Sequence, residues 1–312
     1  MNIKQNPIII GAGLAGLVAA NVWPAAQIIE AAQEPRALHR ALLRFRSDSV
    51  ANLTGIEFRK VLVSKGIYSQ GCFVGPNIRL ANRYTKKVTG RLSGDRSILD
   101  IAPVVRYIAP DTFYEQLITA AQLRIFWNTK ADFDKIRTPH ISTAPLPVVL
   151  NELGIQTDMQ FERAPITVVR CRVRGADLFQ TIYFPDDETP MYRASITGET
   201  LIIEAMTTDV AAKEWLPRAL VLVERAFGLE RAWGTEGVQV METVQQQYGK
   251  IVPISDSDRK SILFSLTQKR SIYSLGRFAT WRNILLDDVV KDAYAIKKMM
   301  NSQPYDVMRS IA

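Results

Sequence analysis

The stretch PIIIGAGLAGLVAANVWPAAQIIE, residues 7–30, decides the fold that this sequence predicts. Its apolar residues and glycines indicate a strand over residues 7–10, a glycine turn, a helix over about residues 14–22, and a second strand over residues 27–30. Pro24 comes just after the helix, where a proline commonly follows the last turn. The stretch therefore predicts a compact βαβ unit.

The turn itself, GAGLAG at residues 11–16, fits the G-x-G-x-x-G pattern of dinucleotide-binding loops. Gly11 permits the tight turn, Gly13 lets a pyrophosphate approach the backbone, and Gly16 lets the helix pack closely on the strand. Free N–H groups at the start of the helix attract phosphates. The alternative is a glycine turn that serves packing alone.

Glu30 ends the second strand, where a carboxylate can accept hydrogen bonds from a ribose diol. An acid at this position disfavours a 2′-phosphate and therefore NADP. The predicted cofactor-binding residues of this unit are Gly11, Gly13, Leu14, Ala15, Gly16, Glu30 and Ala31.

Residues 7–29 are also almost wholly apolar and follow Lys4, which is the pattern of a signal anchor. Asn21, the break at Trp23 and Pro24, and the patterned glycines favour the folded unit instead. We therefore expect no membrane segment and a cytoplasmic protein.

The composition is that of a globular protein: 312 residues, 47% hydrophobic and 22% charged, with a net charge of +8. The positive charge permits an anionic partner. Cys72 and Cys171 are too few for a disulfide framework and are expected to be small core residues. His39, expected on a helix, and His140, expected before a strand, are expected to be structural. No spacing typical of a metal site or a Ser-His-Asp triad is present.

The stretch SLGRFATWRNILLDDVVKDAYAI, residues 274–296, resembles the C-terminal flavin-binding segment of UDP-galactopyranose mutases. Both run from a strand through Gly-Arg and an aromatic loop to an acidic helix start, and monoamine-oxidase-like flavoproteins carry a looser version. The resemblance implies that Gly276 and Arg277 approach FAD, and that the backbone around Asp288 and Val289 faces its ribityl or isoalloxazine portion. A helix start and a guanidinium both stabilise an anionic flavin or pyrophosphate. The alternative is a surface arginine before an ordinary helix.

Two internal stretches fit the same resemblance. TPHISTAPLPVVLNEL, residues 138–153, resembles the strand and Thr-x-Pro turn that return the chain to the FAD domain. FPDDETPMYRASITGETLIIE, residues 184–204, resembles the mutase stretch that places a Tyr-Arg pair in the substrate lobe, here Tyr192 and Arg193.

YGKIVPI, residues 248–254, lies where the family has a strand that enters the FAD site, with Lys250 as a flavin neighbour. The resemblance thus makes Lys250, Tyr192 and Arg193 the candidates for catalysis. One departure concerns residues 30–50, which lack the family's glycine pair and histidine-bearing loop.

The resemblance implies an α/β protein in which a Rossmann-like FAD-binding domain of the glutathione-reductase type is interleaved with a mixed-sheet α+β substrate lobe. Residues 1–45, 130–160 and 245–312 are expected to build the FAD-binding domain. Residues 46–129 and 161–244 are expected to build the substrate lobe. No internal repeat is visible.

Three basic clusters are candidates for contact with an anion. One strand face is expected to carry Arg170, Arg172 and Arg174, and one helix face Arg36, Arg40, Arg44 and Arg46. Residues 79–96, RLANRYTKKVTGRLSGDR, interleave basic residues with Tyr84. Such patterns suit a phosphate backbone, and the alternative is a set of solvated faces without a partner.

A bound flavin accepts hydride itself, so a chain poor in His, Cys and clustered acids suits a flavoenzyme. The resemblance implies an FAD-dependent oxidoreductase, with the cofactor held non-covalently because the terminal motif lacks Cys and His. The chain is also similar to FAD-dependent enzymes of bacteriophage DNA hypermodification, which oxidise a glycyl adduct on thymine. That likeness implies a C–N bond of such an adduct as the substrate, in the cytoplasm of a bacterial host. A nucleotide derivative, a UDP-sugar for a mutase-like enzyme, a small amine, a non-catalytic FAD-stabilised nucleic-acid-binding protein and an NAD-dependent dehydrogenase remain alternatives.

Overall fold

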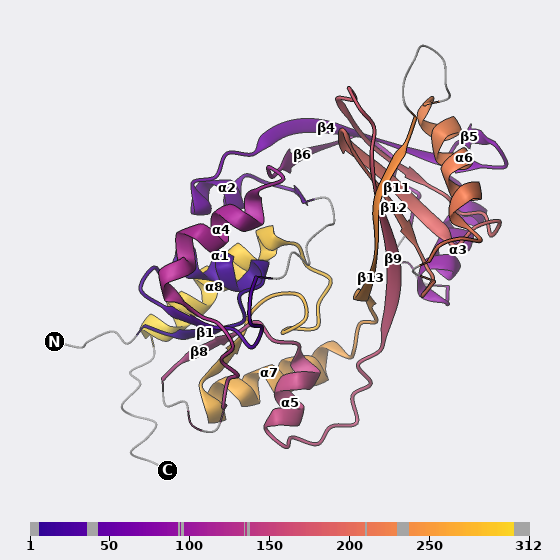
Figure 1. The fold of residues 1–312 in the computed structure, drawn as a ribbon. Helices are drawn as coiled ribbons and strands as arrows, with labels where there is room; N and C mark the ends of the chain where they lie inside the picture. Colours follow the sequence, from indigo (N-terminus) through magenta and orange to yellow (C-terminus); the bar gives the residue numbers. More distant parts are fainter. Residues whose placement is uncertain are drawn as a thin grey trace.

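The structure is a computed structural model, and the residues that it describes are 6–35, 43–92, 94, 97–133, 135, 138–209, 211–229 and 237–302. For residues 247, 248, 250 and 302 the backbone alone is described. Figure 1 shows two lobes side by side, one built on a parallel sheet and one on a large curled sheet. We call them the parallel-sheet lobe and the mixed-sheet lobe.

The parallel-sheet lobe contains the predicted βαβ unit. Its sheet has the order β14-β8-β1-β2-β7, and every neighbouring pair is parallel. The crossover from β1 to β2 is helix α1. The bounds of these elements are β1 (Ile8–Ile10), α1 (Leu14–Val22), β2 (Gln27–Ile29), β7 (Ile125–Phe126), β8 (His140–Ser142) and β14 (Ile272–Ser274).

Helices cover both faces of this sheet because successive side chains of each strand point to opposite sides. Ile9 and Ile141 pack toward α1, whereas Ile10 and Ile272 pack toward the other face. The first face is covered by α1 together with α2 (Ser49–Thr54), α4 (Phe113–Ala121) and α8 (Leu286–Ser302). The second face is covered by α5 (Leu146–Glu152) and α7 (Asp256–Arg270).

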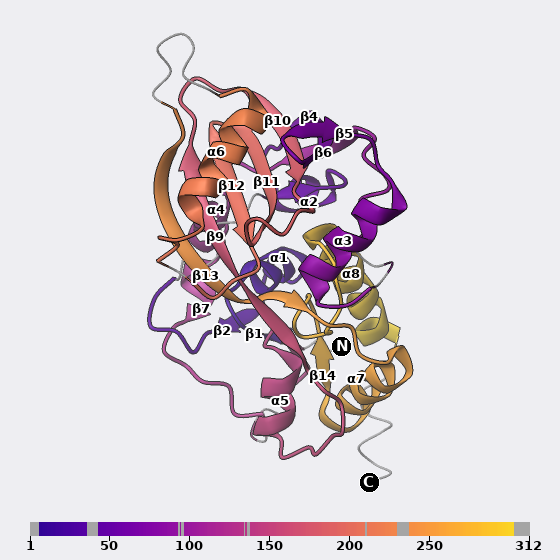
Figure 2. The same cartoon turned by 90° about the vertical axis from the view of Figure 1, so that its right-hand side faces the viewer.

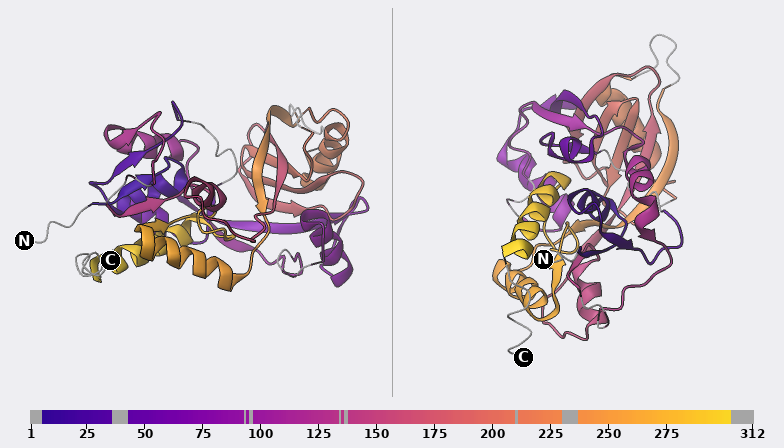
Figure 3. Two further views of the ribbon diagram at one scale, coloured as in Figure 1. Left: turned by 90° about the horizontal axis from the view of Figure 1, so that it is seen from below. Right: turned by 90° about the vertical axis from the view of Figure 1, so that its left-hand side faces the viewer.

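The mixed-sheet lobe has the strand order β13-β9-β12-β11-β10-β4-β6-β3, with β5 paired to β4. Only the β10–β4 pair is parallel in this part of the structure. Figures 2 and 3 show α6 on one face of the sheet. The bounds are β3 (Arg44–Phe45), β4 (Arg59–Ser69), β5 (Cys72–Val74), α3 (Ile78–Thr89), β6 (Val104–Ile108), β9 (Arg163–Arg172), β10 (Leu178–Tyr183), β11 (Met191–Gly198), β12 (Thr200–Ala205), α6 (Leu216–Phe227) and β13 (Gln239–Ile251). The 3-10 helix η2 (Gln122–Arg124) follows α4 in the parallel-sheet lobe.

The chain passes between the two lobes several times, so the lobes are interleaved in sequence. Strand β7 and helices α2 and α4 lie within the expected substrate segment 46–129, yet they belong to the parallel-sheet lobe. Strand β3 lies within the expected cofactor segment 1–45, yet it pairs with β6 of the mixed sheet. The exact domain boundaries therefore stay a prediction.

The two cysteines differ in their surroundings. Cys171 is buried in the core under α6, as expected. Cys72 is exposed, so the expectation of a core residue is wrong there. It lies in the three-residue strand β5, whose first two residues face solvent because β5 pairs with β4 alone. No described helix is long and apolar enough to cross a membrane.

His140 lies within β8 rather than before it, and its side chain is buried with neither ring nitrogen hydrogen-bonded to a described residue. Burial lowers the pKa of His140 to about 4, well below its ordinary value of 6.5. The folded protein therefore holds a neutral imidazole, whereas the unfolded chain binds a proton below about pH 6.5.

Because the unfolded state binds more protons in this range, stability should fall as the pH drops from about 6.5 towards 4. When the pH falls from 7.5 to 5, we expect the parent to lose about 2 kcal/mol more stability than the His140→Leu variant. Urea unfolding of both proteins at the two pH values measures this difference in stability. The two proteins have the same carboxylates, so the contribution of the carboxylates to the pH dependence cancels in the comparison. Equal losses in parent and variant would contradict the assignment.

Candidate functional site

The glycine turn lies at the carboxyl end of β1, beside β8. A Cβ at Gly16 would lie 1.9 Å from the carbonyl oxygen of Gly11, so the close packing of helix and strand requires this glycine. A Cβ at Gly11, whose φ is +100°, would lie 2.4 Å from Oγ1 of Thr143. Gly13 differs, because a Cβ there would meet no atom within 4 Å. The turn thus presents open space at the glycine where a pyrophosphate is expected to approach.

Glu30 borders this turn. Its carboxylate accepts the N–H of Ala12 at 2.7 Å and the N–H of Ala32 at 2.9 Å. These two bonds hold the acid beside the turn at the end of β2. The hydroxyl of Tyr114 on α4 donates to the carbonyl of Ala12 at 3.4 Å, and burial raises the pKa of Tyr114. Ala31, also predicted for the cofactor site, lies exposed beyond β2.

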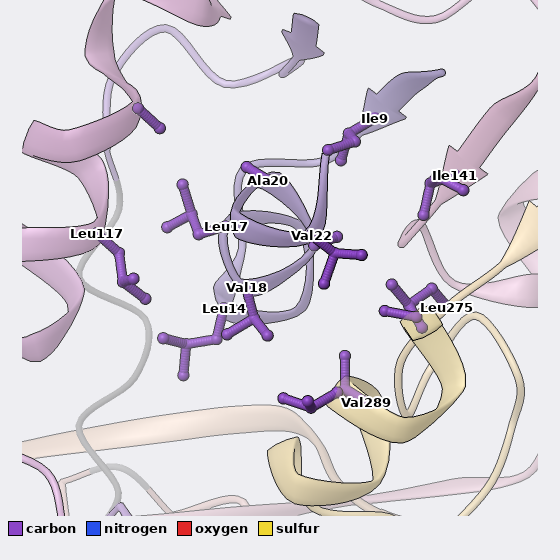
Figure 4. Close-up of a cluster of buried hydrophobic side chains, with 14 of the residues drawn as sticks. Ile9, Leu14, Leu17, Val18, Ala20, Val22, Leu117, Ile141, Leu275 and Val289 are labelled. Carbon is purple, nitrogen blue, oxygen red and sulfur yellow. The ribbon is translucent and has the colours of Figure 1, made fainter. Parts of the chain in front are cut away.

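The C-terminal segment contacts the glycine turn directly. Gly276 has a φ of +100°, and a Cβ there would lie 2.8 Å from the Cβ of Ala15. Figure 4 shows Leu275 and Val289 on one side of α1, with Leu117 on the opposite side. The structure therefore brings the two predicted ends of the site together.

Two predicted site residues have side chains that pack in the core, so only their backbone could contact a cofactor. The side chains of Leu14 and Val289 are buried in the core around α1. Both residues lie in the first turn of a helix, Leu14 in α1 and Val289 in α8. Leu14 is the first residue of α1, where N–H groups have no partner within the helix and are available to an anion. The N–H of Val289 instead donates to the carbonyl of Leu285 at 3.2 Å.

Arg277 lies at the junction between the lobes. It donates to the carbonyl of Gly249 and to Oδ1 of Asn283, both at 3.3 Å, and its guanidinium lies 5.5 Å from the centre of the Phe278 ring. Lys250 follows Gly249 in β13, opposite Ala164. The backbone of Lys250 therefore lies near Arg277, and its side chain is outside the described part of the chain.

Two neighbouring acids begin α8. Asp288 accepts the N–H of Leu285 at 3.0 Å and pairs with Arg46 at 3.5 Å. Asp287, which sequence reasoning missed, is 3% exposed and accepts the N–H groups of Arg46 and Ser47 and the hydroxyl of Ser47. It fixes the chain after β3 against the start of α8. Two consecutive acidic residues at an expected helix start are the sequence signal that could have identified Asp287.

Of the predicted Tyr-Arg pair, Arg193 lines a cavity and Tyr192 is buried in the core. A bulge in the pairing of β11 with β12, between Met191 and Arg193, lets both side chains reach Glu204. The Tyr192 hydroxyl donates to Glu204 at 2.8 Å, and Arg193 forms an ion pair with it. Burial raises the pKa of Tyr192 well above its usual value, so its hydroxyl stays protonated.

The cavity has a volume of about 260 Å³ and lies on the face of the mixed sheet opposite α6. Leu285, just before α8, lines it from the other lobe. The cavity thus adjoins the segment expected to cover a flavin.

Some arginines of the predicted basic clusters form ion pairs with acids. Arg172 contacts Glu199 at 2.7 Å, Arg170 lies 3.9 Å from Glu242, and Arg83 contacts Asp186 at 3.0 Å. Arg174 lies beyond the end of β9.

Tyr84 is buried, with its ring edge-to-face on Tyr183, so it is not free to stack on a base. Lys87 donates to the carbonyls of Phe184 and Asp186, and burial lowers its pKa to about 8. Arg44 lies in strand β3, so the expected helix face is wrong there. Arg36, His39, Arg40, Asp95 and Arg96 lie outside the described residues.

No protein-family model matches the chain, and no curated protein matches it. Among solved structures, the chain is similar to reduced UDP-galactopyranose mutase, with a TM-score of 0.70 and 16% sequence identity over 97% of both chains. It shares that fold.

Two further solved structures have a similar fold. The CLA-producing fatty acid isomerase from P. acnes has a TM-score of 0.59 and 13% identity, over 96% of this chain and 99% of that one. pqsL, a probable FAD-dependent monooxygenase from Pseudomonas aeruginosa, has a TM-score of 0.54 and 13% identity, over 98% and 88%. The expected α/β fold class is confirmed.

Proposed function

We propose that this protein is an FAD-dependent oxidoreductase. The observation that carries the proposal is the open space at Gly13, in a turn whose Ala12 donates to Glu30 and whose Ala15 lies against Gly276. A strand, a glycine turn, a helix and a terminal acid in this arrangement suit an adenine dinucleotide. The fold likeness to pqsL, a probable FAD-dependent monooxygenase, supports FAD as the dinucleotide.

Different residues hold different parts of the cofactor. The N–H groups at the start of α1 and the open space at Gly13 receive the pyrophosphate. Glu30 accepts the ribose hydroxyls, and the backbone around Asp288 and Val289 lies beside the ring system. When bound, FAD supplies hydride acceptance, and the lobes supply orientation and a cavity for the substrate.

The absorption spectrum of the purified protein tests this proposal. We expect a yellow protein that releases FAD on heating and bleaches when a substrate reduces it anaerobically. A colourless protein that binds NAD and not FAD would contradict the proposal.

The finer proposal for the substrate is the C–N bond of a glycyl adduct on thymine in modified DNA. The net charge of +8 and the basic cavity support an anionic substrate of this kind, although the paired arginines weaken the case for a long DNA track. The modified base would have to leave the duplex to reach the cavity. Anaerobic mixing with glycyl-modified DNA should bleach the flavin, and unmodified DNA should leave the spectrum unchanged. No bleaching by the modified DNA would contradict the finer proposal.

A second candidate is a mutase-like enzyme acting on a sugar nucleotide. The fold likeness to UDP-galactopyranose mutase over nearly the whole of both chains favours it. For this candidate, dithionite reduction should be required for turnover, UDP should compete with substrate, and Arg193→Ala should weaken UDP binding. Turnover without reduction would favour the oxidoreductase.

A further inference from the structure

The cavity between the lobes carries an excess of positive charge. Its basic side chains come from four different strands of the curled sheet, and its one described acid is Glu204. Four cations against one carboxylate leave a net charge of +3 in a space of about 260 Å³. The four basic residues are Arg44 on β3, Lys65 on β4, Arg106 on β6 and Arg193 on β11.

Glu204 neutralises a single cation. It forms an ion pair with Arg193 and accepts the hydroxyl of Tyr192, so both of its oxygens are engaged. The remaining three positive charges are left without an acid of their own among the described residues that line the cavity.

Arg44 is the most constrained of these three. Its guanidinium donates to the hydroxyls of Thr181 and Thr197 and to the carbonyls of Gln180 and Ile196, which are all neutral groups. These bonds fix its position across the sheet and leave its charge uncompensated. Burying a charge is costly unless an opposite charge accompanies it.

Lys65 and Arg106 lie on neighbouring strands and face the same cavity. Lys65 has no hydrogen-bond or ion-pair partner in the part of the chain that the structure describes. The one hydrogen bond described for the Arg106 side chain goes to the carbonyl of the adjacent residue, Val105. Both cations are therefore available to a ligand, and neither is needed to join elements of the fold.

We infer that this cavity binds a compact anionic group of the substrate, a carboxylate or a phosphate ester, through the side chains of Lys65 and Arg106, with the fixed positive charge of Arg44 beside them. A guanidinium presents paired donors to either group, and a lysine adds a point charge. The volume suits one such group with a few further atoms, since whole ligands usually occupy about 300–1,000 Å³. The position beside Leu285 places the rest of the substrate toward the proposed flavin, so its role as a substrate site rests on the proposed function.

The test is calorimetric titration of the protein as purified with malonate, inorganic phosphate and adenosine monophosphate at low ionic strength. Lys65→Gln and Arg106→Gln remove two of the cavity charges without removing a contact between elements. Lys213→Gln and Lys269→Gln are matched controls, because both side chains are exposed, lie outside this cavity and belong to none of the predicted basic clusters. Thermal unfolding of all four variants checks that they are folded.

We expect at least one of the three anions to bind with a stoichiometry of one. Its dissociation constant should rise about tenfold or more in each cavity variant and stay within about twofold in each control. Preference for malonate assigns the site to a carboxylate, and preference for phosphate or the nucleotide assigns it to a phosphate.

Absence of binding by all three anions would overturn the inference, and so would equal weakening in the controls. The visible spectrum of the same samples reports the flavin separately. A yellow protein without anion binding contradicts this site alone, whereas a colourless protein that binds the anion contradicts the proposed function.

Discussion

A Gly13→Val variant should fold normally and lose FAD, with an affinity at least about 100-fold below that of the parent, or about 2.7 kcal/mol. Gly13 has a φ of −72°, which a valine adopts without strain, and no atom lies within 4 Å of the new Cβ. The added methyl groups would instead occupy the space proposed for the pyrophosphate. Flavin fluorescence titration of the apoprotein measures the loss.

Gly75→Val is the matched control for this experiment. Gly75 also has open space around its Cβ position and a φ outside the left-handed region, but it lies between β5 and α3 in the other lobe. Its FAD affinity should match that of the parent. Retention of FAD by Gly13→Val would contradict the proposed site, and failure of Gly13→Val to fold would indicate that FAD is needed for structure.

A Trp281→Ala variant should lose about 3–5 kcal/mol of stability, the cost typical of removing a large buried aromatic side chain. Trp281 is 1% exposed, its indole N–H donates to the carbonyl of Val252 at 3.0 Å, and its ring lies edge-to-face 5.1 Å from that of Phe161. It anchors the loop that begins at Gly276, so we also expect weaker FAD binding. Urea unfolding measures the stability.

Trp281→Phe separates packing from hydrogen bonding in the same experiment. It keeps most of the buried area and should cost about 1–3 kcal/mol, mainly for the unpaired carbonyl. Tyr294→Ala, on the exposed side of α8, should stay within about 0.5 kcal/mol of the parent. A Trp281→Ala loss no larger than that of Tyr294→Ala would contradict the anchoring role.

The parts of the fold that depend on local pattern could be predicted from the sequence. The strand, turn and helix of residues 8–22 follow from apolar periodicity and glycine spacing, and the structure confirms them. The resemblance predicted that Gly276 approaches FAD, which is expected at the glycine turn, although the two segments are far apart in sequence. Their contact is likewise present, at Ala15.

Features that depend on long-range pairing could not be predicted. Arg36, Arg40 and Arg44 are four residues apart in sequence, which is the spacing of one helix face, and only the pairing of β3 with β6 shows that Arg44 lies in a strand. The bulge beside Tyr192 buries that residue while leaving Arg193 in the cavity. The cavity cations Lys65 and Arg106 were missed because they belong to separate strands with no shared motif.

The contact of residues 275–289 with α1 also has a consequence for synthesis. The apolar side of α1 emerges from the ribosome well before Leu275 and Val289, which cover it, because the two segments are far apart in sequence. Until then this surface is exposed in the nascent chain, where chaperones recognise such surfaces. A polypeptide truncated before Leu275 would leave this side of α1 uncovered and would be prone to aggregation and proteolysis.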